Sequence, residues 1–311
     1  MSRIAVGTLA DSRMLTGSHE HRRTLLGRAT EGGLDHVFVA DHVSFLTGFG
    51  MDGLIQAATA LALEPSLKVV VGVYLLALRH PVPTARQIAS LCESAPGRFI
   101  LGIGVGGEDR HEIEVCGVDP TTRGRRTSEA MVALRGLLSG EPYTLSGEFF
   151  EFDQALIRPA PDPPVPLIVG GRSDAAIARA AHHGDGWLGI WSSPQRYAVV
   201  LSEIDAIAKS AGRTGKTARD PVDWQHGLQV WVGVDADKAR ARARLAAAMQ
   251  GMYQTPYERF ERYSPAGSAE EIADFLAPYA DAGCRLFNIM PVAESTETAI
   301  DAVCEIKRRL A

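Results

Sequence analysis

The sequence is poor in several features that mark whole classes of proteins, beginning with cysteine. Its 311 residues include four cysteines, and none of them stands in a C-x-x-C pair or in another metal-ligand spacing: Cys92, Cys116, Cys284 and Cys304. This scatter argues against a disulfide framework and against a cysteine-ligated metal site. Since free cysteine is among the most buried residue types, we expect four buried thiols.

Long apolar runs and an excess of basic residues are also missing. The longest apolar stretch, residues 67–78, is broken by Lys68 and Gly72 and falls short of the ~20 residues that a bilayer requires. Because 32 Lys and Arg face 37 Asp and Glu, the basic field used for nonspecific nucleic-acid binding is absent. The N-terminus shows no signal-peptide pattern. We expect a cytoplasmic protein whose partners include neither a membrane nor a nucleic acid.

What the sequence does contain is a regular alternation of short apolar segments with helical ones. The apolar segments have the composition of parallel strands buried on both faces, and they lie at residues 4–8, 36–40, 68–75, 99–103, 167–169, 187–191, 228–234 and 285–290. Helical periodicity occupies residues 21–31, 81–95, 125–138, 174–182, 194–211, 235–249, 269–282 and 296–310. Eight such units predict a (β/α)8 TIM barrel rather than a doubly wound sheet, and a single domain over residues 1–311.

Three segments exceed a plain barrel. Residues 143–152 are typical of a small hairpin around Ser146 and Gly147. Residues 158–166 contain five prolines and predict a stiff connector. Residues 251–267 are rich in Tyr, Pro and Glu, and loops of this length are often lids or binding loops. We expect these insertions at the C-terminal face of the barrel, where TIM barrels build their active sites.

The strongest local signal for a ligand is the turn after the fifth strand, with the sequence Gly170-Gly171-Arg172-Ser173. Two glycines allow the backbone to approach an anion, and the helix that follows presents N–H groups at its positive end. Arg172 can add a charge-assisted hydrogen bond to a phosphate. The alternative is a glycine turn needed only for a tight strand-to-helix connection.

A second glycine motif follows the fourth strand. Gly102, Gly104 and Gly107 satisfy G-x-G-x-x-G, but the dinucleotide fingerprint belongs to the first strand of its unit. We interpret these glycines as allowing close approach of a flat group at the barrel mouth, with ordinary turn chemistry as the alternative. Glu108 is a candidate acid or base, or else a cap of the next helix.

Asp41 and His42 end the second strand and form a candidate acid–base pair, because imidazole titrates near neutral pH and a neighbouring carboxylate tunes it. A structural histidine is the alternative. The motif His19-Glu20-His21 has the H-x-H form of metal hydrolases, but no series of metal-ligating residues follows at the later strand ends. We therefore expect no metal.

Five motifs in order resemble the bacterial luciferase-like flavin or deazaflavin oxidoreductases. They span essentially the whole chain: residues 33–42 with Asp41-His42, Arg79-His80-Pro81, the glycine-rich 97–106, Val169-Gly-Gly-Arg-Ser173 with Gly184-Asp-Gly-Trp187, and Gly267-Ser-Ala-Glu-Glu-Ile272 with Asp281-Ala-Gly283. The resemblance implies a TIM-type barrel, commonly a homodimer, that binds coenzyme F420 or flavin mononucleotide (FMN) at its C-terminal face.

The resemblance also implies roles for individual residues. Gly170, Gly171, Arg172 and Ser173 match the turn that holds the cofactor phosphate, Asp41 matches a contact to the tricyclic ring, and Gly106 and Gly107 belong to the glycines beside it. A bulge that supports the ring, often with a non-proline cis peptide, is expected at Tyr74-Leu75. His42 matches a proton donor or acceptor of similar F420-dependent sugar-phosphate dehydrogenases.

This sequence also departs from those dehydrogenases. Their glutamate after the fourth strand corresponds to Gly107 here, so Glu108 stands one residue late. Residues 227–234 carry none of the basic residues that would hold a sugar phosphate, and Trp191, Trp231 and Tyr74 suggest an apolar, aromatic pocket instead.

The function predicted from the sequence is F420-dependent hydride transfer to or from a small, apolar or aromatic substrate. An FMN-dependent monooxygenase that activates oxygen and a flavin-binding protein without catalysis are the alternatives. A metal-dependent hydrolase on the same barrel is the least favoured.

Overall fold

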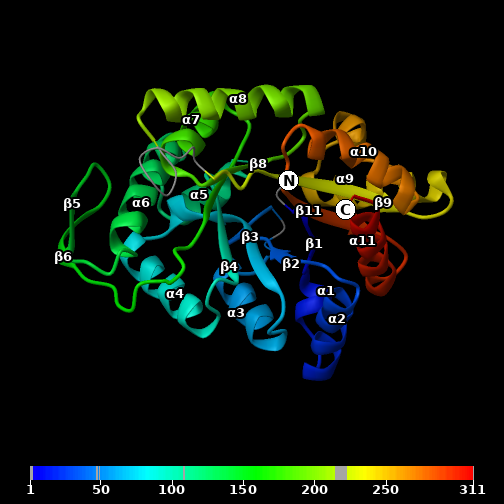
Figure 1. Ribbon diagram of the computed structural model, residues 1–311, viewed down its shortest axis with the longest axis horizontal. Coiled ribbons are helices and arrows are strands. Elements are labelled where there is room, and N and C mark those ends of the chain that lie inside the picture. Colours follow the sequence, from blue (N-terminus) through cyan, green and yellow to red (C-terminus); the bar gives the residue numbers. More distant parts are fainter. Residues whose placement is uncertain (1–2, 47, 49, 108, 214–222, 311) are drawn as a thin grey trace.

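The eight predicted strands close into a barrel. The computed structural model describes residues 3–46, 48, 50–107, 109–213 and 223–310. Each barrel strand runs parallel to both of its neighbours in the order β11-β1-β2-β3-β4-β7-β8-β9, and the pairing of β9 with β11 closes the ring. The predicted TIM barrel is confirmed, and Figure 1 shows the helices arranged around it.

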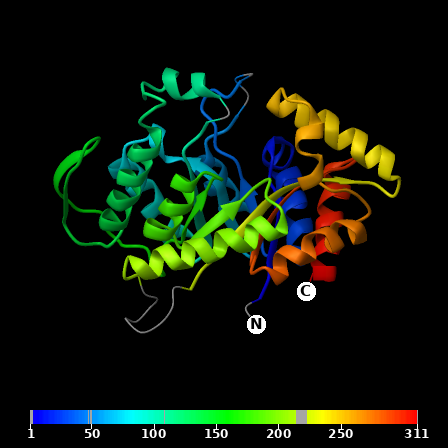
Figure 2. The ribbon, with the colours of Figure 1, turned by 90° about the horizontal axis from the view of Figure 1, so that it is seen from above.

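The strands lie close to their predicted positions. The barrel strands are β1 (Ala5–Leu9), β2 (His36–Val39), β3 (Lys68–Leu75), β4 (Phe99–Gly104), β7 (Leu167–Gly170), β8 (Gly186–Gly189), β9 (Gly227–Val234) and β11 (Leu286–Val292). The predicted hairpin is present as β5 (Tyr143–Ser146) and β6 (Glu151–Ala155), and it projects from one side of the barrel (Figure 2). A two-residue strand, β10 (Ala266–Gly267), pairs with β9.

The eight predicted helices are also present. They are α2 (His19–Glu31), α4 (Pro81–Ser94), α6 (Arg123–Leu137), α7 (Asp174–His183), α8 (Pro194–Ser210), α9 (Lys238–Tyr253), α10 (Ala269–Asp281) and α11 (Thr296–Leu310). Three further helices were not predicted: α1 (Ser12–Leu15), α3 (Gly53–Leu63) and α5 (Arg110–Val115). Within the described part of the chain no helix is long and apolar enough to cross a membrane.

The thiols largely follow the sequence prediction. Cys92, Cys284 and Cys304 are buried without disulfides, whereas Cys116 is only half-buried.

Strand β3 carries the irregularity that the resemblance implied, but at a different position. The cis peptide joins Gly72 to Val73, and the register of β3 against β4 shifts between Val71 and Tyr74. The expected position at Tyr74-Leu75 was therefore wrong by two residues.

Val73 explains the glycines of the two neighbouring strands. A Cβ atom added to Gly104 would lie 2.4 Å from Val73 Cγ2, and one added to Gly170 would lie 2.9 Å from Val73 Cγ1. One added to Gly102 would lie 2.3 Å from the carbonyl oxygen of Val71. Gly102 and Gly104 thus make room for the bulge of β3, which corrects our interpretation of them as an approach surface for a flat ligand.

The crowding at Gly102 predicts a large loss of stability for Gly102→Ala. The methyl group would meet backbone rather than a flexible side chain, so we expect unfolding to be easier by about 3 kcal/mol, the upper end of the usual overpacking range. Gly27→Ala is the matched control, because nothing lies within 4 Å of its added Cβ in α2; this variant should be neutral or more stable. Urea unfolding measures both, and equal stabilities would contradict the packing role.

A candidate active site at the barrel mouth

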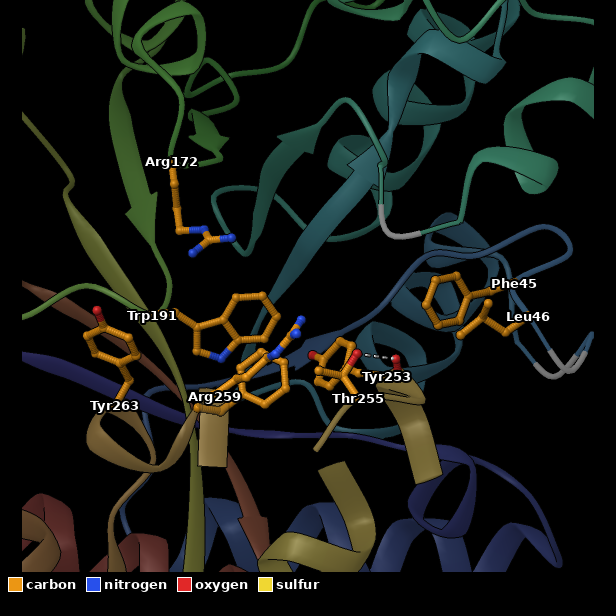
Figure 3. Close-up of a pocket in the computed structure, with 9 residues that line it drawn as sticks. Phe45, Leu46, Arg172, Trp191, Tyr253, Thr255, Arg259 and Tyr263 are labelled. Carbon is orange, nitrogen blue, oxygen red and sulfur yellow. Dashed lines mark hydrogen bonds between the residues drawn. The ribbon is translucent and has the colours of Figure 1, made fainter. Parts of the chain in front are cut away.

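A cavity of about 390 Å³ opens at the C-terminal end of the barrel strands. Figure 3 shows side chains from segments far apart in the sequence around it. It is lined by Phe45 and Leu46 after β2, by Arg172 after β7, by Trp191 after β8, by Tyr253 at the end of α9, and by Thr255, Arg259, Phe260 and Tyr263 in the segment that follows. The predicted role of residues 251–267 as a binding loop agrees with this position.

Asp41 is a deeply buried carboxylic acid at this end of the barrel, with 1% of its surface exposed. Its carboxylate accepts hydrogen bonds from the backbone N–H of Gly53 at 2.9 Å and of Leu75 at 2.8 Å, and Arg79 pairs with both oxygens at 2.8 Å. Burial raises the pKa of Asp41, and Arg79 with the two N–H groups opposes that rise. Every oxygen of Asp41 is thus engaged within the protein, and the geometry gives it a structural position beneath the mouth rather than a contact with a ring.

His42 lies beside Glu112 rather than beside the carboxylate of Asp41. Its Nδ1 is 3.1 Å from Glu112 Oε2, and the imidazole side chain keeps 21% of its surface exposed. Since an ionised carboxylate only accepts hydrogen bonds, Nδ1 carries the proton, and Nε2 has no hydrogen-bond partner among the described residues. Phe45 stacks on the imidazole with ring centroids 4.2 Å apart.

Glu112 organises the whole segment that carries His42. One of its oxygens also accepts the backbone N–H groups of Val43 at 2.7 Å and Ser44 at 3.1 Å. Burial raises the pKa of Glu112, but His42 and these two N–H groups outweigh burial and bring the pKa below its ordinary value. Asp109, the N-cap of α5, accepts the N–H of Leu46 at 2.7 Å, so α5 fixes residues 42–46 at both ends.

The predicted anion-binding turn lies at the start of α7. Gly171 has a φ of +126°, which favours glycine, and Ser173 caps the helix by accepting the N–H of Ala176 at 3.3 Å. Arg172 is exposed and stacks over the indole of Trp191, with its guanidinium carbon 5.2 Å from the ring centroid.

A second arginine at this end of the barrel, Arg123, was not predicted. Arg123 begins α6, and a Cβ added to Gly107 would lie 3.6 Å from its Nη2. One nitrogen of Arg123 donates to the carbonyl of Pro120, whereas its buried Nε has no partner in the described structure. Because α6 and α7 follow the adjacent strands β4 and β7, Arg123 and the Gly171 turn face the same end of the barrel.

Aromatic side chains form the wall opposite Phe45. The ring of Trp191 lies 4.6 Å from that of Phe260 and 5.2 Å from that of Tyr253, measured between centroids. Trp231 in β9 donates its indole N–H to the hydroxyl of Tyr253 at 3.0 Å. Trp191 itself has a φ of +48°, an uncommon value for a bulky residue.

Of the remaining predicted residues, Tyr74 and Leu75 are buried, and Glu108 lies outside the described residues. Tyr74 is 1% exposed and its ring packs in the core beneath Arg79, 4.5 Å from the guanidinium carbon, so its side chain does not line the mouth. Leu75 is also buried, and a Cβ added to Gly106 would lie 3.7 Å from it.

The ion pair of Asp41 predicts a large effect for Arg79→Met. Removing the cation leaves a buried carboxylate without a counter-charge, and we expect a loss of about 3–5 kcal/mol in unfolding free energy at pH 7. Since burial raises the pKa of Asp41, protonation of the folded variant at low pH should reduce this deficit. The double variant Asp41→Asn with Arg79→Met should recover part of it. A single variant as stable as wild type in urea unfolding would refute the role.

The pH dependence of the stability of Glu112→Gln tests the pairing of Glu112 with His42. The folded-state pKa of Glu112 lies below its usual 4.5, so its stabilisation is complete above that pH and disappears as pH falls through the folded-state value. The variant should be less stable than wild type by about 1–2 kcal/mol at pH 7, and the difference should shrink below pH ~4.5. Glu114→Gln on the same helix, an exposed residue paired with Arg110, should change little. A difference independent of pH would contradict the assignment.

Comparisons with known proteins give relatives that match part of the chain. An uncharacterised protein of Mycobacterium tuberculosis is 33% identical over 139 residues, 45% of this chain and 48% of that protein. The F420-dependent glucose-6-phosphate dehydrogenase of Beutenbergia cavernae is 31% identical over 219 residues, which cover 68% of this chain and 64% of the enzyme. The chain thus spans about half to two thirds of the length of these curated relatives.

The fold and a family profile extend the likeness to nearly the whole chain. A solved structure of an F420-dependent secondary alcohol dehydrogenase, in complex with an F420–acetone adduct, aligns over 100% of both chains with a TM-score of 0.83 and 22% identity. At that identity the likeness shows the fold. The profile of the luciferase-like monooxygenases matches residues 5–287. The chain therefore belongs to the luciferase-like monooxygenase family.

Proposed function

We propose that the protein is an F420-dependent oxidoreductase that transfers a hydride between the deazaflavin and a small organic substrate. The observation that carries the proposal is the His42–Glu112 pair, placed at the barrel mouth on the same face as an anion-binding turn. The names of two relatives support the choice of cofactor, since the dehydrogenase of Beutenbergia cavernae and the structurally similar alcohol dehydrogenase are both described as F420-dependent.

The residues at this end of the barrel fit a cofactor that carries a phosphate. The turn at Gly171 and the first turn of α7 offer backbone N–H groups at a positive helix end. Arg172 has no ion pair within the described residues, and the buried Nε of Arg123 lacks an acceptor. Buried donors without partners are rare in proteins, so an acceptor at Arg123 would complete its hydrogen bonding. These groups would hold the phosphate.

The cofactor supplies two-electron hydride chemistry when bound, and the chain supplies orientation and a route for the accompanying proton. Oxidation of an alcohol to a carbonyl releases a proton together with the hydride, and reduction consumes one. Glu112 holds the proton of His42 on Nδ1, so Nε2 accepts or donates the proton that moves at the mouth. This is the arrangement of an acid–base group oriented by a carboxylate.

The cofactor assignment is tested by titrating the purified protein with F420 and with FMN and following fluorescence quenching. We expect F420 to bind at least ~10-fold more tightly than FMN, a difference of about 1.4 kcal/mol. Tight FMN binding without a response to F420 would overturn the F420 assignment and favour the monooxygenase alternative.

His42→Ala tests catalysis separately from cofactor binding. With a panel of secondary alcohols and oxidised F420, and of the matching ketones and reduced F420, we expect kcat to fall ~10²–10⁴-fold while the Kd of F420 changes little. His182→Ala, at an exposed position late in α7, is the control and should retain wild-type turnover. Equal turnover of the two variants would contradict the role of His42, and no turnover by wild type across the panel would favour a binding function.

A further inference from the structure

Among the described residues, the cavity at the barrel mouth is lined by two guanidinium groups and by no carboxylate. Among the residues that line it, Arg172 and Arg259 are the charged ones, and in the described part of the chain neither has an ion pair. Figure 3 shows them on opposite sides of Trp191, with Arg172 descending from the β7–α7 turn and Arg259 on the wall formed after α9.

The acidic residues nearest to Arg259 along the chain are engaged elsewhere or turned away from the cavity. Glu261 pairs with Arg242, with Arg242 Nε 2.5 Å from Glu261 Oε1, and this pair lies on the α9 side of the segment. Glu258 is exposed and is not among the residues that line the cavity. The segment therefore directs an uncompensated positive charge into a cavity whose other walls are mostly aromatic.

Trp191 adds an unsatisfied donor at the centre of this arrangement. Its Nε1 is buried and has no hydrogen-bond partner within the described residues, although buried donors are usually paired. Its φ of +48° is a strained backbone value, and such strain clusters at functional sites. Within the described structure, the cavity thus combines three side chains whose donor groups have no protein acceptor (Arg172, Trp191 and Arg259) with the apolar surfaces of Phe45, Leu46 and Phe260.

We propose that the substrate of this cavity is an apolar carboxylic acid whose carboxylate pairs with Arg259. Its apolar body packs against Trp191, Phe260 and Phe45, and planar guanidinium–carboxylate pairing sets its orientation. The inference rests on the proposed oxidoreductase function and names its substrate class. Arg259 is assigned to the substrate rather than to the cofactor phosphate, because Figure 3 shows it across Trp191 from Arg172, the arginine that follows β7.

The experiment measures binding rather than turnover, so that it stands apart from the test of the cofactor. Isothermal titration calorimetry, with and without saturating F420, compares four carboxylates with their neutral amides: benzoate, 3-phenylpropionate, hexanoate and decanoate. For at least one pair, the acid should bind ~10-fold or more tightly than the amide, the size expected for one charge-assisted pair.

Variants of Arg259 test whether this side chain causes the preference for the acid over the amide. Arg259→Gln should reduce the preference for the acid ~10-fold with less than a ~3-fold change for the amide, and Arg259→Lys should restore part of it. Arg23→Gln is the matched control, because Arg23 is exposed on α2, does not line the cavity and has no ion pair in the described structure. It should bind acids as wild type does.

Two results would overturn the proposal. One is a panel in which no acid binds better than its amide. The other is an acid preference that survives Arg259→Gln. If F420 still binds in either case, only the substrate class is wrong. If acid binding depends on Arg259 but the protein binds neither F420 nor FMN, the proposed oxidoreductase function is wrong. The carboxylate site at Arg259 is then still confirmed.

Discussion

The ion pair of Asp41 with Arg79 is the constraint on which the rest of the mouth depends. Asp41 follows β2, Arg79 follows β3, and the same carboxylate accepts N–H groups from Leu75 at the end of β3 and from Gly53 at the start of α3. A single buried charge therefore fixes the relative positions of two strands and one helix. His42 is the next residue along the chain, so its place relative to the barrel is set by this pair before Glu112 orients the ring.

The bulge of β3 shows a second constraint, which acts through volume instead of charge. Val73 turns toward the positions where β4 and β7 carry Gly104 and Gly170, and the inner barrel below is filled by larger apolar residues such as Ile100 and Leu188. The bulge of β3 therefore packs only because β4 and β7 carry glycine at the positions that Val73 contacts.

Much of the fold could be predicted from sequence because alternating apolar segments and helical periodicity are local signals. Helix α3 was missed because its sequence is apolar on nearly every side and therefore lacks the polar face on which the prediction relied. The pairing of His42 with Glu112 joins residues 70 positions apart, and no spacing rule connects them. Similarly, Gly102 and Gly104 satisfy a ligand motif, but their neighbour proved to be the backbone and side chain of β3, which local sequence cannot distinguish from a ligand.

Helix α5 has six residues, far fewer than an isolated helix needs to be stable in water. Its stability must come from its surroundings, including the backbone N–H groups of residues 43, 44 and 46 that Glu112 and Asp109 accept. Phe45, in the same segment, contacts both the cavity and the ring of His42. A ligand that packs on Phe45 would therefore act on the same segment that α5 holds, and by reciprocity a stronger hold by α5 on that segment would favour the ligand.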